Sequence, residues 1–156
     1  MITIKTYHEQ YQADFIRLNK EWIETYFRLE ESDLRTFANI DSYILGNGGQ
    51  IFLAIDDSSG KVVGCCALIN HPEKNVYELA KMAVSPKAQG KHIGYKLGLA
   101  LIEYARQLGA KRLYLEGNTH LAASIHLYRN LGFKEVSLDG STYDRCDIIM
   151  ELDFAD

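Results

Sequence analysis

Apolar residues recur every three or four positions in several parts of the chain, which is the spacing of an amphipathic helix. The clearest early example is the stripe formed by Phe15, Leu18, Trp22 and Tyr26. This spacing predicts helices over residues 12–27, 32–38, 94–108 and 121–131. Ser32 is a candidate N-cap for the second of these helices. Glycine follows the last two helices, as is common where a helix ends.

Apolar runs that alternate with polar residues, or that are bounded by turn residues, predict strands between these helices. The predicted strands cover residues 2–7, 51–56, 62–69, 77–84, 112–116, 133–137 and 147–152. The early strands form a hairpin around the turn DDSSGK, whereas the later strands alternate with helices. We therefore predict an α/β fold with a mixed central β-sheet of six to seven strands flanked by helices. A length of 156 residues fits a single domain over residues 1–156.

Composition and charge narrow the function classes. Hydrophobic residues make up 47% of the chain, which is enough for a buried core. The net charge is −4, which argues against a nucleic-acid-binding surface. No apolar stretch approaches the ~20 residues that cross a bilayer. The first ten residues, MITIKTYHEQ, lack an apolar signal core, so we expect a cytoplasmic protein without membrane partners.

The cysteines and histidines do not suggest a metal site. The three cysteines are expected to be free thiols, and Cys65 and Cys66 are neighbours on a strand, where they point to opposite faces. The five histidines follow no metal-ligand spacing. We therefore predict no bound metal.

The stretch VSPKAQGKHIGYKLG places two glycines, Gly90 and Gly94, at the start of a predicted helix. Backbone N–H groups at a helix start lack acceptors and favour an anion such as a pyrophosphate. Three lysines in this stretch, Lys87, Lys91 and Lys96, strengthen that interpretation. The alternatives are an ordinary strand–helix turn and a solvated charged loop.

Two common nucleotide-binding motifs do not fit this turn. A P-loop requires Lys after its last glycine, and here Tyr95 follows Gly94. A Rossmann turn requires GxGxxG directly after the strand, and here Ser-Pro-Lys-Ala intervenes.

The segment Gln89-Gly90-Lys91-His92-Ile93-Gly94 resembles the acyl-CoA loop of the GNAT acetyltransferases, Arg/Gln-x-x-Gly-x-Gly/Ala. The segment ASIHLYRNLGF resembles the second motif of that family, A-x-x-L-Y-x-x-x-G-F. The resemblance is strong over residues 77–136. It differs at His92, where the family usually has Gly.

The resemblance implies a GNAT fold and an enzyme that transfers an acetyl group from acetyl-CoA to a primary amine by direct attack in a ternary complex. In the family, the backbone of the strand before the loop binds the pantetheine arm, which here corresponds to Met82, Ala83 and Val84. The loop binds the pyrophosphate. Its predicted cofactor-binding residues are Gln89, Gly90, Lys91, His92, Ile93, Gly94 and Tyr95.

The resemblance also assigns catalytic roles. Tyr128 corresponds to the tyrosine that protonates the leaving thiolate, although a core aromatic is the alternative. Asn118 resembles an asparagine used near the cofactor, and helix capping is its alternative role.

An amine must lose a proton before it attacks, so a base is expected. Glu116 and Glu78 are the candidates. We favour Glu116, which ends a strand and precedes the Tyr128 helix, an arrangement expected to place both groups on one side. Glu78 could instead pair with a surface lysine.

The amine acceptor is expected to contact aromatic and acidic groups of the early helices and the loop before the last strand. The candidates are Trp22, Tyr26, Phe27, Glu30, Glu31, Tyr143, Asp144 and Arg145. Core packing and surface exposure are the alternative roles of these residues. A non-catalytic acyl-CoA-binding sensor or interaction module on the same fold is the alternative function. A homodimer is compatible with either function.

Overall fold

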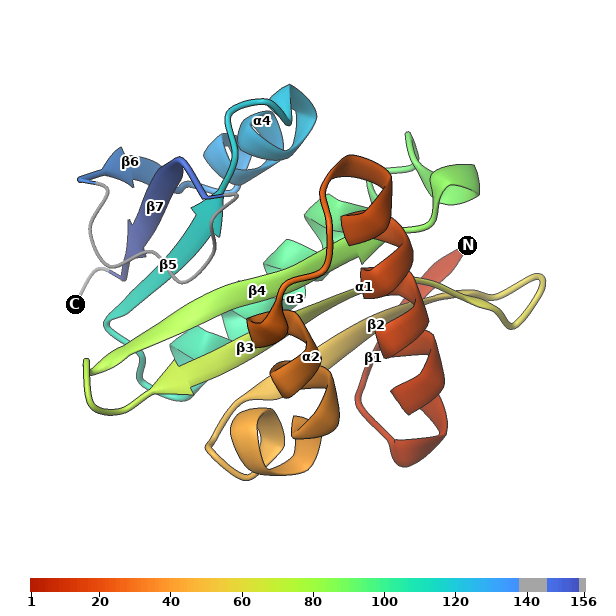
Figure 1. Cartoon of the computed structure of the whole chain (residues 1–156), viewed down its shortest axis with the longest axis horizontal. Coiled ribbons are helices and arrows are strands. Elements are labelled where there is room, and N and C mark those ends of the chain that lie inside the picture. Colours follow the sequence, from red (N-terminus) through yellow and green to blue (C-terminus); the bar gives the residue numbers. More distant parts are fainter. Residues whose placement is uncertain (138–145, 155–156) are drawn as a thin grey trace.

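The computed structural model describes residues 1–137 and 146–154, which form a seven-stranded mixed sheet (Figure 1). The strand order is β1-β2-β3-β4-β5-β7-β6. The strands are β1 (Ile2–Thr6), β2 (Gln50–Asp56), β3 (Val62–His71), β4 (Val76–Val84), β5 (Arg112–Gly117), β6 (Lys134–Val136) and β7 (Ile148–Asp153). All neighbours pair antiparallel except β4 and β5, which are parallel. The predicted α/β class and mixed sheet are confirmed.

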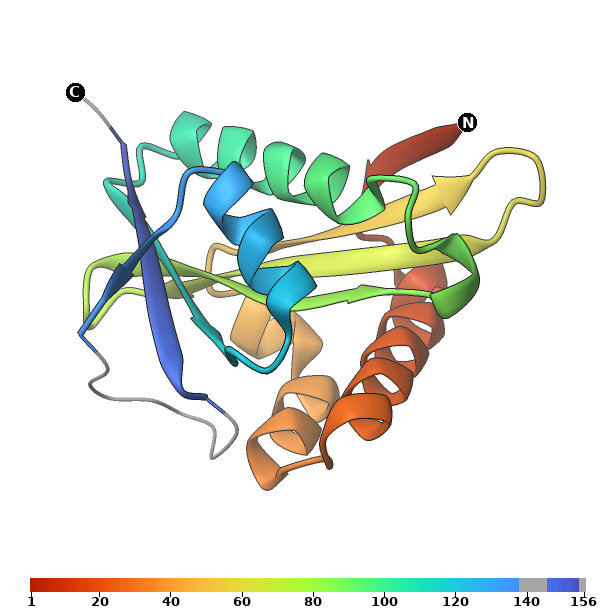
Figure 2. The same ribbon diagram turned by 90° about the horizontal axis from the view of Figure 1, so that it is seen from above.

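Helices cover both faces of the sheet (Figure 2). The longer helical segments are α1 (Gln12–Tyr26), α2 (Glu31–Ala38), α3 (Ile93–Gln107) and α4 (Ala122–Asn130). Helices α1 and α2 lie on one face and α3 and α4 on the other. Each face therefore has its own apolar core, one centred on Phe15 and Ile51 and the other on Leu97 and Leu113. None of the helices in the described part of the chain has the length and hydropathy needed to cross a bilayer.

Three short segments complete the described structure: η1 (Glu9–Tyr11), η2 (Ile40–Leu45) and η3 (Pro86–Ala88). The sequence did not predict η2, a π-helical segment in which Ile40 and Ile44 are buried. The predicted cap at Ser32 is wrong, because α2 begins one residue earlier and Glu30 is its N-cap. Glu30 and Asp33 form a capping box, in which the Asp33 carboxylate accepts the Glu30 N–H at 2.9 Å.

Strands β4 and β5 separate soon after they begin (Figure 1). Only Tyr77 and Glu78 of β4 pair with β5, opposite Leu113 and Tyr114. From residue 79 onward, the edge of β4 that would face β5 has no strand partner among the described residues. This separation opens the middle of the sheet.

Strand β4 also contains a bulge. Ala80 pairs with Ala67 and Ala83 pairs with Cys65, so two residues of β4 lie opposite one residue of β3. Lys81, one of the two, has a left-handed backbone with φ of 56°. The bulge sets the direction of the side chains that follow along β4.

Candidate active site

A cleft of about 90 Å³ lies where β4 and β5 separate, and we call it the β4–β5 cleft. Residues 78–82 of β4 form one wall and residues 116–118 at the end of β5 form the other. The end of α1 closes it on one face of the sheet, and α4 closes it on the other. The cleft therefore reaches from one side of the sheet to the other.

Two predicted carboxylates and the predicted acid line this cleft. Leu115 is buried in the core under α3 and α4, so strand alternation places its neighbour Glu116 on the opposite face. Tyr128 packs against the core under α3 and α4. The expectation that Glu116 and Tyr128 lie on one side is therefore wrong, because they enter the cleft from opposite faces of the sheet.

Glu78 is held by hydrogen bonds from two neighbouring strands. Its Oε1 lies 2.9 Å from Nε2 of His71 and accepts a bond of 3.3 Å from the Tyr114 hydroxyl. The side chain of Glu78 is only 8% exposed. Burial, together with the charges of Glu78 and Glu116, raises the pKa of Tyr114, so this hydroxyl stays a donor at neutral pH. The suggested pairing of Glu78 with a surface lysine is not what the structure shows.

The Tyr128 hydroxyl has no hydrogen-bond partner among the residues that the structure describes, although the residue lines the cleft. Its ring contacts Phe133 edge-on, with 6.3 Å between ring centroids. Burial raises the pKa of the Tyr128 hydroxyl, so it keeps its proton at neutral pH. A protonated hydroxyl in this position can donate a hydrogen bond or a proton into the cleft.

Lys81 and Asp33 form an ion pair beside the cleft that the sequence did not predict. The Lys81 Nζ lies 2.7 Å from Asp33 Oδ1, and the two side chains are 3% and 0% exposed. The ammonium group also lies 5.5 Å from the centre of the Phe37 ring. This pair ties α2 to the bulge of β4.

The glycine turn leaves backbone N–H groups without helical acceptors at the start of α3. The first bond of the helix runs from Lys96 N–H to the His92 carbonyl at 3.1 Å, so the N–H groups of Ile93, Gly94 and Tyr95 have no acceptor within the helix. A Cβ added to Gly90 would meet no atom within 4 Å, so the turn is open on that side. This geometry fits a bound anion.

His92 takes the left-handed conformation, with φ of 60°, that glycine adopts most easily. Its side chain is exposed. The family's usual glycine at this position therefore has a structural reason, and His92 meets the same backbone requirement at a cost in strain.

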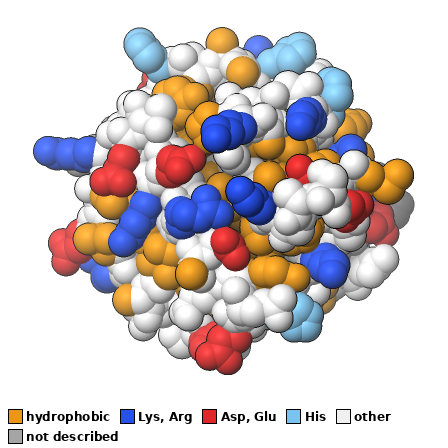
Figure 3. Space-filling view, turned by 90° about the vertical axis from the view of Figure 1, so that its right-hand side faces the viewer, with side chains coloured by type: hydrophobic (Ala, Val, Ile, Leu, Met, Phe, Trp, Pro, Cys, Tyr) orange, Lys and Arg blue, Asp and Glu red, His pale blue; other side chains and the backbone are white. Residues whose placement is uncertain are grey.

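Lys87, Lys91 and Lys96 are all exposed around this turn. Figure 3 shows the side of the molecule on the right of Figure 1, where Lys and Arg side chains gather near the centre with acidic side chains among them. Solvated lysines and an anion-binding loop both agree with this arrangement.

Asn118 has a local structural role. Its side-chain oxygen accepts the His120 N–H at 2.8 Å, and its carbonyl accepts the Leu121 N–H at 3.0 Å. These bonds shape the turn that leads into α4. Asn118 also lines the cleft, which is compatible with a role near the cofactor. The alternative role as a helix cap is wrong, because the N-cap of α4 is Leu121 and Asn118 bonds to His120, which precedes the helix.

The predicted acceptor residues divide into three groups. Trp22 and Phe27 line the cleft, with 6.3 Å between their ring centroids. Tyr26, Glu30 and Glu31 are not among the lining residues. Tyr26 is exposed and contacts the Trp22 ring, and the two glutamates lie at the start of α2. Tyr143, Asp144 and Arg145 lie outside the described residues.

Sequence reasoning missed His71, Tyr114 and the Lys81–Asp33 pair. Lys81 carries a signal, since it is a charged residue within the apolar run YELAKMAV. Its partner lies 48 residues earlier, so the sequence alone could not identify the pair. Among residues 1–137 and 146–154, no three His, Cys, Asp or Glu side chains gather as metal ligands would.

Comparison with known proteins agrees with this geometry. The sequence model described as the acetyltransferase (GNAT) family matches residues 11–133. An uncharacterized N-acetyltransferase of Escherichia coli K12, YjgM, is 40% identical over 79 residues, which are 49% of this chain and 47% of that protein. The chain thus spans about half the length of this curated relative, and a smaller share of the next two.

Solved structures share the fold. A GNAT acetyltransferase from Staphylococcus aureus Mu50 superposes with a TM-score of 0.87 at 23% identity, covering 98% of this chain and 99% of that one. YncA of Salmonella typhimurium, solved with acetyl-CoA, superposes with a TM-score of 0.78 at 23% identity, covering 100% and 95%.

Proposed function

The chain belongs to the GNAT acetyltransferase family, and on that premise we propose that it transfers an acetyl group from acetyl-CoA to a primary amine. The observation that carries the proposal is the β4–β5 cleft, which brings two carboxylates and a protonated tyrosine together at the unpaired edge of β4. A cytoplasmic location and a homodimer stay predictions from the sequence.

Acetyl-CoA fits the residues present. The edge of β4 from residue 79 onward leaves backbone groups available to a strand-like partner, and Met82, Ala83 and Val84 lie in that segment. The strand leads through η3 directly to the turn of residues 89–95, where the free N–H groups suit the pyrophosphate. When bound, acetyl-CoA would supply the activated acyl group.

We propose Glu78 as the proton acceptor. The two hydrogen bonds on Oε1 fix its carboxylate, and Oε2 makes no hydrogen bond within the described part of the chain. A general base requires a carboxylate held in a fixed position with one oxygen available to accept a proton. The sequence-based preference for Glu116 stays a prediction, and Glu116 adds negative charge that suits a cationic amine.

An ammonium group loses two protons when it becomes an amide N–H. Glu78 takes one and releases it to solvent. Tyr128 gives a proton to the departing thiolate, and the second amine proton replaces the one that Tyr128 has lost. The new C–N bond forms as the C–S bond breaks.

The test measures thiol release from acetyl-CoA with a panel of primary amines and identifies the acetylated product by mass spectrometry. The wild type should release thiol only when an amine is present. Tyr128→Phe keeps the ring, and its turnover should fall by about 10²-fold with acetyl-CoA binding nearly intact. Tyr104→Phe is the matched control, because Tyr104 packs on Phe52 away from the cleft.

Two results would contradict the proposal. Wild-type turnover in the Tyr128→Phe variant would remove the role of that hydroxyl. Acetyl-CoA binding without thiol release across the whole panel would favour the non-catalytic acyl-CoA-binding module instead.

A further inference from the structure

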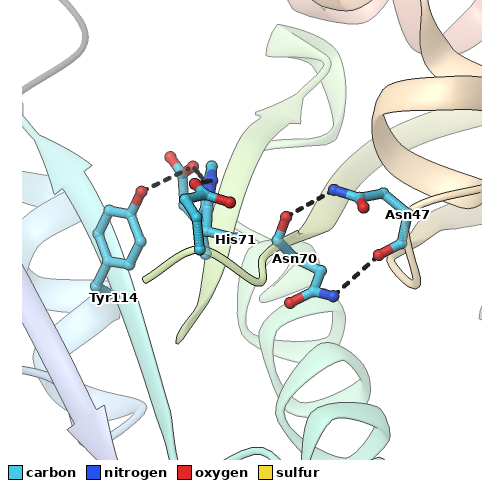
Figure 4. Close-up of polar contacts among 6 residues, drawn as sticks. Asn47, Asn70, His71 and Tyr114 are labelled. Carbon is cyan, nitrogen blue, oxygen red and sulfur yellow. Dashed lines mark hydrogen bonds and ion pairs between the residues drawn. The ribbon is translucent and has the colours of Figure 1, made fainter. Parts of the chain in front are cut away.

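His71 lies at the end of β3 and contacts the proposed base. Ile69 of β3 pairs with Glu78 of β4, and His71 follows two residues later on the same face. Its Nε2 lies 2.9 Å from Glu78 Oε1. Figure 4 shows the imidazole of His71 next to Tyr114, which belongs to β5, on the other side of β4.

The backbone that carries His71 is itself held in place. The side-chain amide of Asn47 donates to the Asn70 carbonyl at 3.0 Å, and the amide of Asn70 donates to the Asn47 carbonyl at 3.0 Å (Figure 4). These reciprocal bonds fix the residue before His71. The imidazole is therefore a well-supported partner for Glu78.

Acidic groups lie on both sides of the imidazole. Nδ1 lies 3.6 Å from the exposed Glu73 carboxylate, while Nε2 faces Glu78. The hydrogen bond to Glu78 raises the pKa of His71, with burial acting in the opposite direction. The titratable groups around it are Glu78 on β4, Tyr114 and Glu116 on β5, Tyr43 on η2, and Glu73 and Lys74 in the turn after β3.

We propose that His71 is a positioning residue whose imidazolium holds the Glu78 carboxylate in place so that Oε2 remains available to the acceptor amine. This inference rests on the proposed function. The bond from a charged imidazolium is stronger than one from a neutral donor. Tyr114 supplies the second, neutral bond to the same oxygen.

A first experiment tests the coupling without any activity. The pKa of His71 is measured by NMR titration of the ring nitrogens in the full chain, with the His71 signal identified by its absence in His71→Gln. We expect a value above the usual ~6.5 in the wild type. Glu78→Gln should lower it by about one pH unit, because the carboxylate charge is lost. An unchanged value would overturn the proposal.

A second experiment measures kcat and KM with acetyl-CoA and an amine that the wild type acetylates. His71→Gln keeps a neutral donor and removes the charge, so kcat should fall about tenfold with KM for acetyl-CoA unchanged. His71→Leu, which has neither a hydrogen-bond donor nor a charge at this position, should lower kcat further. His126→Gln, an exposed position on α4, is the control and should match the wild type.

The pH dependence separates positioning from simple strand support. The ratio of wild-type kcat to that of His71→Gln should be largest while the imidazolium is charged. It should approach one as the pH rises through the His71 pKa measured by NMR. If the wild type is active and the ratio is one at all pH values, the role of His71 is overturned, but the proposed function is not. A wild type inactive with every amine would overturn the proposed function itself.

Discussion

Lys81 and Asp33 place two opposite charges in an interior that otherwise consists mostly of apolar side chains. Both are buried, and the pair joins α2 to the bulge of β4 beside the cleft. Burying a charge costs free energy unless a partner compensates it, and removing one partner leaves the other uncompensated. We therefore infer that this pair fixes the wall of the cleft.

Lys81→Met should lower the free energy of unfolding by about 3–5 kcal/mol, because Asp33 stays buried without the ammonium. The double variant Lys81→Met with Asp33→Asn removes both charges and keeps an oxygen for the capping bond to Glu30. It should recover about 2 kcal/mol of that loss. Urea unfolding measures both. A single variant as stable as the wild type would show that the pair contributes nothing.

The residues that the sequence could identify are those tied to a local pattern. Tyr128 and the turn of residues 89–95 belong to motifs, and Glu78 and Glu116 stand within or at the end of predicted strands. The contacts of His71 with Glu78 and Tyr114 depend on the register of three strands, which no local pattern determines. The same limit applies to Lys81 and Asp33.

The elements themselves follow the hydrophobic pattern closely. Helix α3 and strands β2 and β3 lie where periodicity and turn residues predict them, because one face or both faces of each are buried. The bulge of β4 was not predicted, since it depends on pairing with β3 rather than on the β4 sequence. The bulge and the early separation from β5 are the features that form the cleft.

His92 at the start of α3 tests the backbone requirement of the turn. A left-handed conformation costs an L-residue about 1–2 kcal/mol, and glycine avoids this cost. Part of the gain is lost, because glycine has more conformational entropy in the unfolded state. His92→Gly should therefore raise the free energy of unfolding by about 0.5–1 kcal/mol. The affinity for acetyl-CoA should not change, because the backbone N–H groups stay in place.

His92→Ala is the matched control, since alanine removes the imidazole but keeps the Cβ. It should not stabilise the chain. Chemical denaturation of the three proteins measures the difference. A glycine variant less stable than the wild type would mean that the His92 side chain contributes a contact that outweighs its strain.

The whole molecule brings together two features that are distant along the chain. The crossover through α3 makes β4 and β5 parallel, and their separation opens the cleft in the middle of the sheet (Figures 1 and 2). The free edge of β4 runs from this cleft toward the start of α3. We propose that acetyl-CoA lies along this edge, with its pyrophosphate at the turn of residues 89–95 and its acetyl group in the β4–β5 cleft.

Calorimetric titration of acetyl-CoA into the wild type, Gly94→Glu and Gly94→Gln tests this placement of the pyrophosphate. Gly94 lies in the first turn of α3, and a Cβ there would lie 3.0 Å from a terminal carbon of Leu127, so thermal unfolding must first show that both variants are folded. Glutamate and glutamine are similar in size, so their difference isolates charge. We predict tight binding by the wild type, and a loss of well over tenfold in Gly94→Glu, which is more than ~1.4 kcal/mol, with a smaller loss in Gly94→Gln. Unchanged affinity in a folded Gly94→Glu variant would contradict the account.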